Sequence, residues 1–351
     1  METERIVIRP KRRKCKCCVM PETPGFIEIG DDGICNICKE RGVGTVEKSE
    51  DTFDKLDPQK KLSILQKKVD RFKTGGQYDC VCSVSGGKDS IMTLYIAKKI
   101  LGLNPLAVMI DSGFALKEMP ENLANATDIL GIDSIIFKMF DIKDIFRLFL
   151  QSGKRIYYCR LCHALLDLKI HDIAKRYGVN LILGGYTKGQ QYIQKSELFW
   201  IYEESDKNTV DVLKDHPKYD YVLELYKNQT GYFRKHFPTI AQISPFKYIE
   251  WNEDEILRIL TTELKFKRSA MSWPINSSNC LFNHVAQYMV EKDFGYAQHE
   301  VELSELVRAG EMTRERALEI SESPIYESAV RDSLDKLGLK YEDIMGGYTN
   351  A

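Results

Sequence analysis

The stretch "CSVSGGKDSIMTLYIAKKI", residues 82–100, decides the fold of this chain. An apolar run ends near Val84, a glycine-rich turn follows, and a helical pattern then covers residues 89–101. Glycines let the backbone turn tightly and direct its N–H groups at an anion, and the first turn of a helix adds a partial positive charge. The order of strand, glycine turn and helix therefore predicts a phosphate-binding loop.

The pattern around this loop alternates between short apolar runs and amphipathic segments. Residues 161–177 carry Leu166, Ile170, Ala174 and Tyr177 on one helical stripe. Strands that alternate with helices indicate an α/β fold with a doubly wound parallel sheet, whose ligands bind beyond the carboxyl ends of the strands. The predicted strands are residues 78–84, 105–111, 134–140 and 180–185.

Composition sets broad limits on the function. The 351 residues include 50 basic and 51 acidic side chains, so the net charge of -1 gives no argument for a nucleic-acid partner. The chain shows no apolar stretch of the roughly 20 residues that a membrane helix needs, and we expect no membrane association and a cytoplasmic location. In a reducing compartment the ten cysteines are expected to be metal ligands or reactive thiols.

Five of the cysteines lie near the N-terminus. Two C-x2-C pairs, separated by sixteen residues, have the spacing of a four-cysteine zinc site on two tight turns. An Asp-Gly turn inside "GFIEIGDDGIC" predicts a hairpin that brings the pairs together. The predicted Zn²⁺ ligands are Cys15, Cys18, Cys35 and Cys38, with Cys17 left over.

These patterns divide the chain into four parts. Residues 1–45 are predicted to form a zinc ribbon, 46–76 a linker helix, and 77–250 a nucleotide-binding domain with an insertion at 190–240 over the site. Residues 251–351 are predicted to be helical. Within that last region, Thr313 is a predicted helix N-cap and Gly310 a predicted helix end.

"SGGKDS" after a strand resembles the pyrophosphate loop of the PP-loop ATP pyrophosphatases. The resemblance implies ATP with Mg²⁺, cleavage between the α and β phosphates, and transfer of AMP to a substrate oxygen. It also implies a nucleoside contact at Asp111 and a second glycine segment, Gly184–Gln191, where the family often has a Gly-His pair. The implied loop residues are Ser85, Gly86, Gly87, Lys88, Asp89 and Ser90, with Gly184 and Gly185 beside them.

A second cysteine group, Cys159, Cys162 and Cys280, suits a [4Fe-4S] cluster with one iron left open. Other interpretations are a second zinc site with His163, a redox disulfide, or inert thiols. The helix start predicted at the pair is expected to lower the thiol pKa values. PP-loop enzymes that thiolate transfer RNA show this arrangement, so the resemblance implies sulfur transfer through the open iron or a persulfide.

The chain as a whole resembles the N-acetyl sugar amidotransferases of bacterial surface-glycan pathways, such as those for lipopolysaccharide O-antigen and pseudaminic acid. The resemblance rests on "CKCCVMPET", on "SGGKDS" and on "LVRAGEMTRERALE". It implies a sugar or nucleotide-sugar substrate, adenylation of its acetamido oxygen, and ammonia from a partner glutaminase. The three distal cysteines depart from that family's pattern. The oligomeric state stays open, a homodimer included.

Three weaker features complete the predictions. The basic run Lys11–Cys17 is interpreted as a solvated face rather than an RNA contact, and His299 with Glu300 as a helix-surface pair. The turn-like run Asn276–Asn279 is expected to reach the active site if Cys280 does. A non-catalytic zinc-ribbon adaptor that only binds nucleotide is a third hypothesis, and the intact Lys88 and Asp89 argue against it.

Overall fold

A computed structural model describes residues 4–41, 53, 56–186, 196–250, 252–275 and 279–345. Five parallel strands form one sheet in the order β3-β2-β1-β4-β5. The central strand is β1 (Cys80–Ser83). On one side of it lie β2 (Pro105–Asp111) and β3 (Ser134–Lys138), and on the other side lie β4 (Leu181–Gly184) and β5 (Ala241–Ile243).

The chain starts the sheet at β1 and extends it first through β2 to β3, then through β4 to β5. Val81 of β1 lies in register with Leu106 on one side and Ile182 on the other. The order of the strands therefore reverses between β1 and β4, which makes their carboxyl ends the topological switch point. The predicted α/β fold with a parallel sheet is confirmed.

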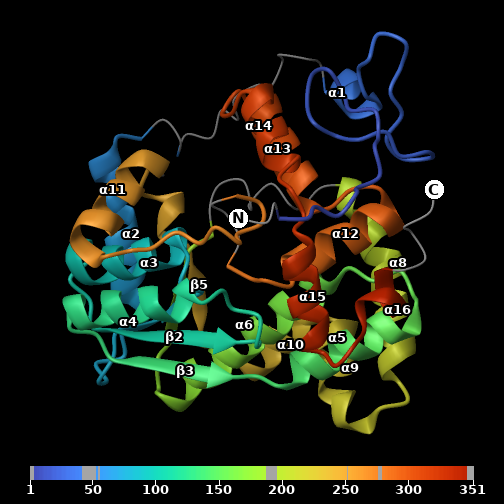
Figure 1. The fold of residues 1–351 in the computed structure, drawn as a ribbon. Coiled ribbons are helices and arrows are strands. Elements are labelled where there is room, and N and C mark those ends of the chain that lie inside the picture. Colours follow the sequence, from blue (N-terminus) through green and yellow to red (C-terminus); the bar gives the residue numbers. More distant parts are fainter. Residues whose placement is uncertain are drawn as a thin grey trace.

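Helices cover both faces of this sheet (Figure 1). One face carries α2 (Pro58–Phe72), α3 (Lys88–Tyr95), α4 (Glu118–Leu130) and α11 (Glu253–Leu264), which pack on Cys82 and its neighbours. The other face carries α6 (Tyr158–Arg176), which packs on alternate strand residues. Successive side chains of a strand point to opposite faces of the sheet, so each buried strand contributes side chains to the core on either face. The second core includes Val81, Leu106, Val108, Ile170, Ile173, Ala174 and Ile182.

The predicted linker helix is integrated into the core. Residues 46–52 lie outside the described part of the chain, and α2 begins with Asp57 as its N-cap and Pro58 in its first turn. Leu65 and Val69 of α2 are fully buried against the sheet face. α2 therefore packs as part of the sheet domain and does not stand apart from it as a linker.

A third core joins the sheet domain to the C-terminal helices. Here α5 (Asp141–Ser152) and α6 meet α12 (Asn283–Phe294) and α15 (Glu327–Asp335). Closely spaced aromatic rings fill the centre, and the rings of Phe146 and Phe282 have centroids 4.5 Å apart. Such pairs add to the free energy of area burial. The ring cluster also contains Phe114, Phe149 and Tyr158.

The insertion predicted at 190–240 is helical where the structure describes it. It contains α8 (Ser196–Leu213), α9 (Asp220–Lys227) and α10 (Gln229–His236). α8 packs against α5, and Ser205 accepts a hydrogen bond from the backbone N–H of Tyr157 at 2.8 Å. The insertion therefore flanks the start of α6, where the second cysteine pair lies.

The N-terminal module is irregular apart from α1 (Asn36–Glu40). The predicted hairpin is reduced to isolated bridges, such as Ile29 with Cys35, rather than two strands. Its turn ends at Gly33, whose φ of +81° favours glycine, and Asp32 accepts a hydrogen bond from the N–H of Ile34. A module of this size buries too little to extend strands further.

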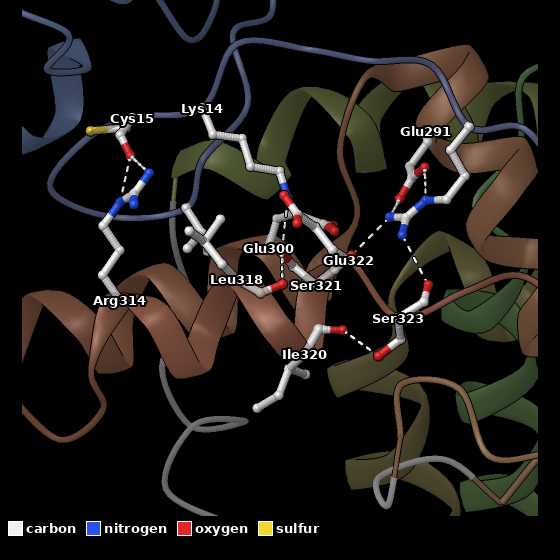
Figure 2. A network of polar contacts seen from close by, with 12 residues as sticks. Lys14, Cys15, Glu291, Glu300, Arg314, Leu318, Ile320, Ser321, Glu322 and Ser323 are labelled. Carbon is white, nitrogen blue, oxygen red and sulfur yellow. Dashed lines mark hydrogen bonds and ion pairs between the residues drawn. The ribbon is translucent and has the colours of Figure 1, made fainter. Parts of the chain in front are cut away.

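Charged side chains fasten this module to the C-terminal helices (Figure 2). Arg314, at the start of α14 (Arg314–Ser321), donates hydrogen bonds to the carbonyls of Cys15 and Cys18 at 2.8–3.1 Å. Lys14 donates to Ser321 Oγ at 2.8 Å and pairs with Glu322 at 3.3 Å. Part of the basic run is therefore committed to intramolecular contacts.

The C-terminal region also contains α13 (Gln298–Arg308) and α16 (Tyr341–Met345). Thr313 caps α14 by accepting a hydrogen bond from the N–H of Arg316, as predicted, and Gly310 follows α13 with a φ of +69°. No helix in the described residues is long and apolar enough to cross a membrane.

We expect Arg9→Met to lower the free energy of unfolding by about 3 kcal/mol, because it leaves a largely buried carboxylate without its partner. Arg9 forms a paired contact with Glu291 and donates to the carbonyls of Ser321 and Ser323 at 2.9–3.0 Å. Chemical denaturation measures the change. Lys11→Met, at an exposed position in the same segment, is the matched control. Equal stability of the two variants would contradict the assignment.

Candidate functional site

The predicted phosphate loop lies at the switch point, between the end of β1 and the start of α3. Gly86 has a φ of +83°, and a Cβ there would lie 2.4 Å from the backbone oxygen of Met119. Ser90 Oγ donates to the carbonyl of Gly87 and accepts from the N–H of Ser85, at 3.0 and 3.1 Å. These contacts hold the turn closed behind the first residues of α3.

The end of β4 packs directly on this loop. A Cβ on Gly185 would lie 2.9 Å from the backbone of Asp89 and Ser90, so only glycine fits there without displacement. Gly87 is the N-cap of α3 and, having no side chain, makes no side-chain capping hydrogen bond of its own. The start of α3 is therefore oriented as an anion site requires.

Cationic side chains surround the loop. Lys88 is largely buried and its ammonium lies 3.6 Å from both Asp89 and Glu253, the first residue of α11. A pocket beside the loop contains Lys267 and Arg268. Its lining residues are Gly87, Lys88, Met119, Leu257, Phe266, Lys267, Arg268, Ser269, Ser272 and Asn279. The positive charge beside a glycine turn matches the negative charge of a polyphosphate.

Two asparagines connect the loop to distant segments. Buried Asn122 of α4 donates to the carbonyls of Gly86 and Lys267, at 3.0 and 2.9 Å. Asn279 donates to Ser85 Oγ at 2.8 Å, and its side chain occupies the space beside Gly87. The run that precedes Cys280 therefore reaches the loop at Asn279, while Asn276–Ser278 lie outside the described residues.

The second cysteine group gathers beside this loop. Cys280 forms a bridge with Ala115, in the segment after β2, and directly follows Asn279. Cys159 and Cys162 occupy the first turns of α6, and Cys159 Sγ lies 3.9 Å from Oδ1 of Asn283, which opens α12. Burial, and to a smaller extent the charge of Cys280, raises the pKa of both other thiols. The three cysteines thus come from two segments, the start of α6 and the run before α12.

The expected lowering of their pKa values is wrong. Burial raises the pKa of Cys159 to about 12 and that of Cys280 to about 11, and it also raises the pKa of Cys162. Desolvation disfavours the thiolate more than the helix start favours it, because the thiols are packed among apolar groups of two cores. All three are free thiols, so no disulfide links the pair.

These sulfurs are not grouped like ligands of a single ion. In the described residues, the cysteines at 15, 18, 35 and 38 form the one set of metal-ligating groups gathered within 4.8 Å, and Cys159, Cys162 and Cys280 do not form a second. A second zinc site with His163 therefore lacks support. A polynuclear cluster separates its ligands more widely than a single ion does, and three thiol donors fit its chemistry.

Titratable side chains line the same region. Burial lowers the pKa of His163 and of His299, and the two histidines interact electrostatically. The surface-pair interpretation of His299 and Glu300 is wrong. Glu300 is buried and accepts a hydrogen bond from the N–H of Ala297, while the His299 ring meets Trp273 edge-on with centroids 5.4 Å apart.

The N-terminal cysteines form a metal-binding geometry. Sγ of Cys15 lies 4.0 Å from that of Cys38, and Sγ of Cys18 lies 3.9 Å from that of Cys35. Tetrahedral zinc with bonds of about 2.3 Å places its sulfurs about 3.8 Å apart. The donor set and the spacing therefore fit one zinc ion. Cys17 is not one of the set.

The remaining predicted residues lie at the same edge of the sheet. Asp111 ends β2 and accepts a hydrogen bond from the N–H of Gly113 at 2.7 Å, so its carboxylate holds the turn after the strand. Gly184 ends β4 beside the ring of Tyr186. Residues 187–191 of the second glycine segment lie outside the described part. The nucleoside contact at Asp111 stays a prediction.

Several site residues had no signal in the sequence. Asn122 lies in the middle of an amphipathic helix, Glu253 in an acidic first turn, and Arg268 in a short loop. Asn122 and Glu253 reach the loop through contacts with Gly86 and Lys88, which lie far from them in the sequence. A buried asparagine within a helical stripe is the sole local hint.

Comparisons with known proteins support the resemblance to surface-glycan enzymes. Residues 276–346 match the family model "LPS biosynthesis protein WbpG-like, C-terminal domain". The chain is also similar to the uncharacterized protein MJ1599 of Methanocaldococcus jannaschii, with 25% identity over 328 residues, covering 93% of this chain and 99% of that protein. The matched C-terminal segment begins at the run that contacts the phosphate loop.

Three solved structures are similar to this chain over much of its length. The U34-tRNA thiolase NcsA of Methanococcus maripaludis, solved with its [4Fe-4S] cluster, has 16% identity and a TM-score of 0.38, covering 88% of this chain and 89% of its own. The NH3-dependent NAD synthetase of Campylobacter jejuni has 14% identity and a TM-score of 0.32, covering 60% and 94%. The NMN synthetase of Francisella tularensis has 13% identity and a TM-score of 0.38, and the match covers 76% of this chain and 97% of that protein.

Cys35→Ser is expected to abolish stoichiometric zinc binding, because one of four ligands is lost. Metal analysis of purified protein measures the zinc per chain. Cys17→Ser is the matched control, since Cys17 lies in the same module outside the ligand set. Full zinc content in Cys35→Ser would refute the ligand assignment.

Proposed function

We propose that this protein is an ATP-dependent transferase that adenylates a carbonyl oxygen and then replaces it. The observation that supports this most is the glycine loop at the switch point, closed by Gly86 and Gly185 and flanked by Lys88. The first turn of α3, with its partial positive charge directed at this turn, suits the pyrophosphate part of ATP. ATP with Mg²⁺ is the proposed nucleotide.

The proposed chemistry has two displacements. The acceptor's carbonyl oxygen forms a bond to the α-phosphorus of ATP, the bond between the α-phosphorus and the bridging oxygen breaks, and pyrophosphate leaves with the negative charge. A nucleophile then attacks the activated carbon, and AMP leaves with the acceptor's oxygen. Lys88 and the start of α3 stabilise the charge that develops on pyrophosphate.

The first candidate transfers nitrogen. The match of residues 276–346 to a lipopolysaccharide biosynthesis domain favours an N-acetylated sugar of a surface glycan as the acceptor. Ammonia would attack the adenylated acetamido carbon and give an acetamidine after loss of a proton. We propose that a partner glutaminase supplies this ammonia, and Lys88 and Asp89 are the proposed catalytic residues of the loop.

The second candidate transfers sulfur, and it rests on the position of the second cysteine group. Asn279 contacts the loop while Cys280 adjoins the region of Cys159 and Cys162. These three thiols would hold a [4Fe-4S] cluster, which supplies an iron coordination position for a sulfur species when bound. Asn279 and Asn283 would keep the thiol-bearing segments aligned with the loop. A transfer RNA or a small molecule would be the acceptor.

ATP is expected to yield AMP and pyrophosphate, and Lys88→Ala is expected to lower turnover by at least about a hundredfold. The ammonium serves the developing charge rather than the core, so the variant should unfold at nearly the same temperature. Separation of nucleotide products by chromatography and thermal unfolding measure both. Lys67→Ala, at an exposed position of α2, is the control. ADP as the product would overturn the proposed chemistry.

Iron content and the visible spectrum of protein purified without oxygen separate the two candidates. Sulfur transfer predicts a broad brown absorption and about four irons per chain, both lost in Cys280→Ser. Cys82→Ser, at a buried cysteine on the sheet, is the control that keeps the colour. Nitrogen transfer predicts a colourless protein whose ammonia-dependent AMP formation is unchanged in Cys280→Ser.

A further inference from the structure

A second pocket, of about 410 Å³, lies at the carboxyl end of the edge strand β5. It is lined by the last turns of α2 and by the segment that leaves β5. This volume falls within the roughly 300–1,000 Å³ of small-molecule sites. The lining residues are Lys68, Arg71, Phe72, Gln242, Ile243, Ser244, Lys247 and Tyr248.

Three of the lining side chains are cations without an acidic partner. Within the described residues, Lys68, Arg71 and Lys247 form no ion pair, and each is exposed. The nearest acid on the same helix, Asp70, pairs instead with Lys73 at 3.2 Å. Three uncompensated positive charges around one pocket generate a local field that attracts an anion.

Uncharged polar groups complete the wall of the pocket. The hydroxyl of the buried Tyr248 accepts a hydrogen bond from Lys68 Nζ at 2.8 Å, which fixes that ammonium at the pocket wall. The Lys68 ammonium also lies 5.3 Å from the centre of the Tyr248 ring. An amide at Gln242 and a hydroxyl at Ser244 add to the wall. Fixed cations with polar neighbours suit the oxygens of a phosphate group.

This pocket is connected to the phosphate loop by two short paths. Ser244 donates to the backbone oxygen of Tyr186 at 2.5 Å, and Gly185, just before Tyr186, packs on Asp89 and Ser90. The segment leaving the pocket at Lys247 and Tyr248 also leads into α11, whose Glu253 contacts Lys88. The pocket and the glycine loop are therefore joined through the segments after β4 and β5.

We propose that the pocket of Lys68, Arg71 and Lys247 binds a phosphate or diphosphate group of the acceptor substrate. The inference deepens the proposed function, on which it rests, by assigning a phosphorylated or nucleotide-linked acceptor. A small ligand is favoured over RNA because three cations in one confined pocket fall short of an extended basic track, and because the Tyr248 ring is buried and cannot stack on a base. The formal charge of -1 agrees with this choice.

The test uses the full chain saturated with α,β-methylene-ATP, which fills the phosphate loop and resists cleavage. Calorimetric titration with inorganic pyrophosphate is expected to show one further site. Arg71→Glu and Lys247→Glu are each expected to weaken it at least about tenfold, because a cation in contact is replaced by a repelling charge. Lys67→Glu, an exposed neighbour outside the pocket, is expected to leave it unchanged.

The outcomes separate the pocket from the proposed function. No pyrophosphate binding to nucleotide-saturated protein, or equal affinities in all three variants, would overturn the pocket. Unfractionated transfer RNA that binds the wild type and is released by Arg71→Glu, without any pyrophosphate site, would assign the cations to RNA and overturn it too. Failure of the wild type to bind α,β-methylene-ATP would instead sink the proposed function, whatever the pyrophosphate titration shows.

Discussion

The close packing of two glycines on backbone atoms at the switch point is the constraint on which the site depends. Gly86 leaves no room for a side chain against Met119, and Gly185 leaves none against Asp89 and Ser90. Through these two contacts, the end of β4 and the start of α4 both pack against the glycine turn after β1. A turn held from both sides can present its N–H groups without reorganisation when charge develops on a ligand. Asn122, Asn279 and Glu253 reach this turn from three other segments.

The C-terminal region is part of that arrangement. Asn279 reaches the loop, Cys280 pairs with the segment after β2, and α12 then carries the chain into the aromatic core. Helix α14 of the same region holds the N-terminal cysteine module through Arg314 and Lys14. The C-terminal region therefore contacts the glycine loop, the aromatic core and the cysteine module.

Local patterns predicted the parts of the structure that local forces determine. The loop, the central strands, the grouping of the four N-terminal cysteines and the caps at Gly310 and Thr313 could all be predicted from spacing and residue type. The three-residue strand β5 was missed because its pairing to β4, not its own propensity, makes it a strand. Asn122, Glu253 and the pocket at β5 depend on contacts between distant segments, which no window of sequence contains. The prediction of lowered thiol pKa values failed for the same reason, because burial depends on the tertiary structure.

Burial also bears on the choice between nitrogen and sulfur. Thiols whose pKa values are raised by desolvation stay protonated at neutral pH, and a protonated thiol is a poor nucleophile. Burial therefore disfavours direct attack by Cys159 or Cys280 on an activated carbon. The remaining roles are to ligate iron, which itself favours the thiolate, or to shape an apolar wall beside the loop. In the second role the wall would keep water from the adenylate while ammonia enters, and the cysteines would have no chemistry of their own.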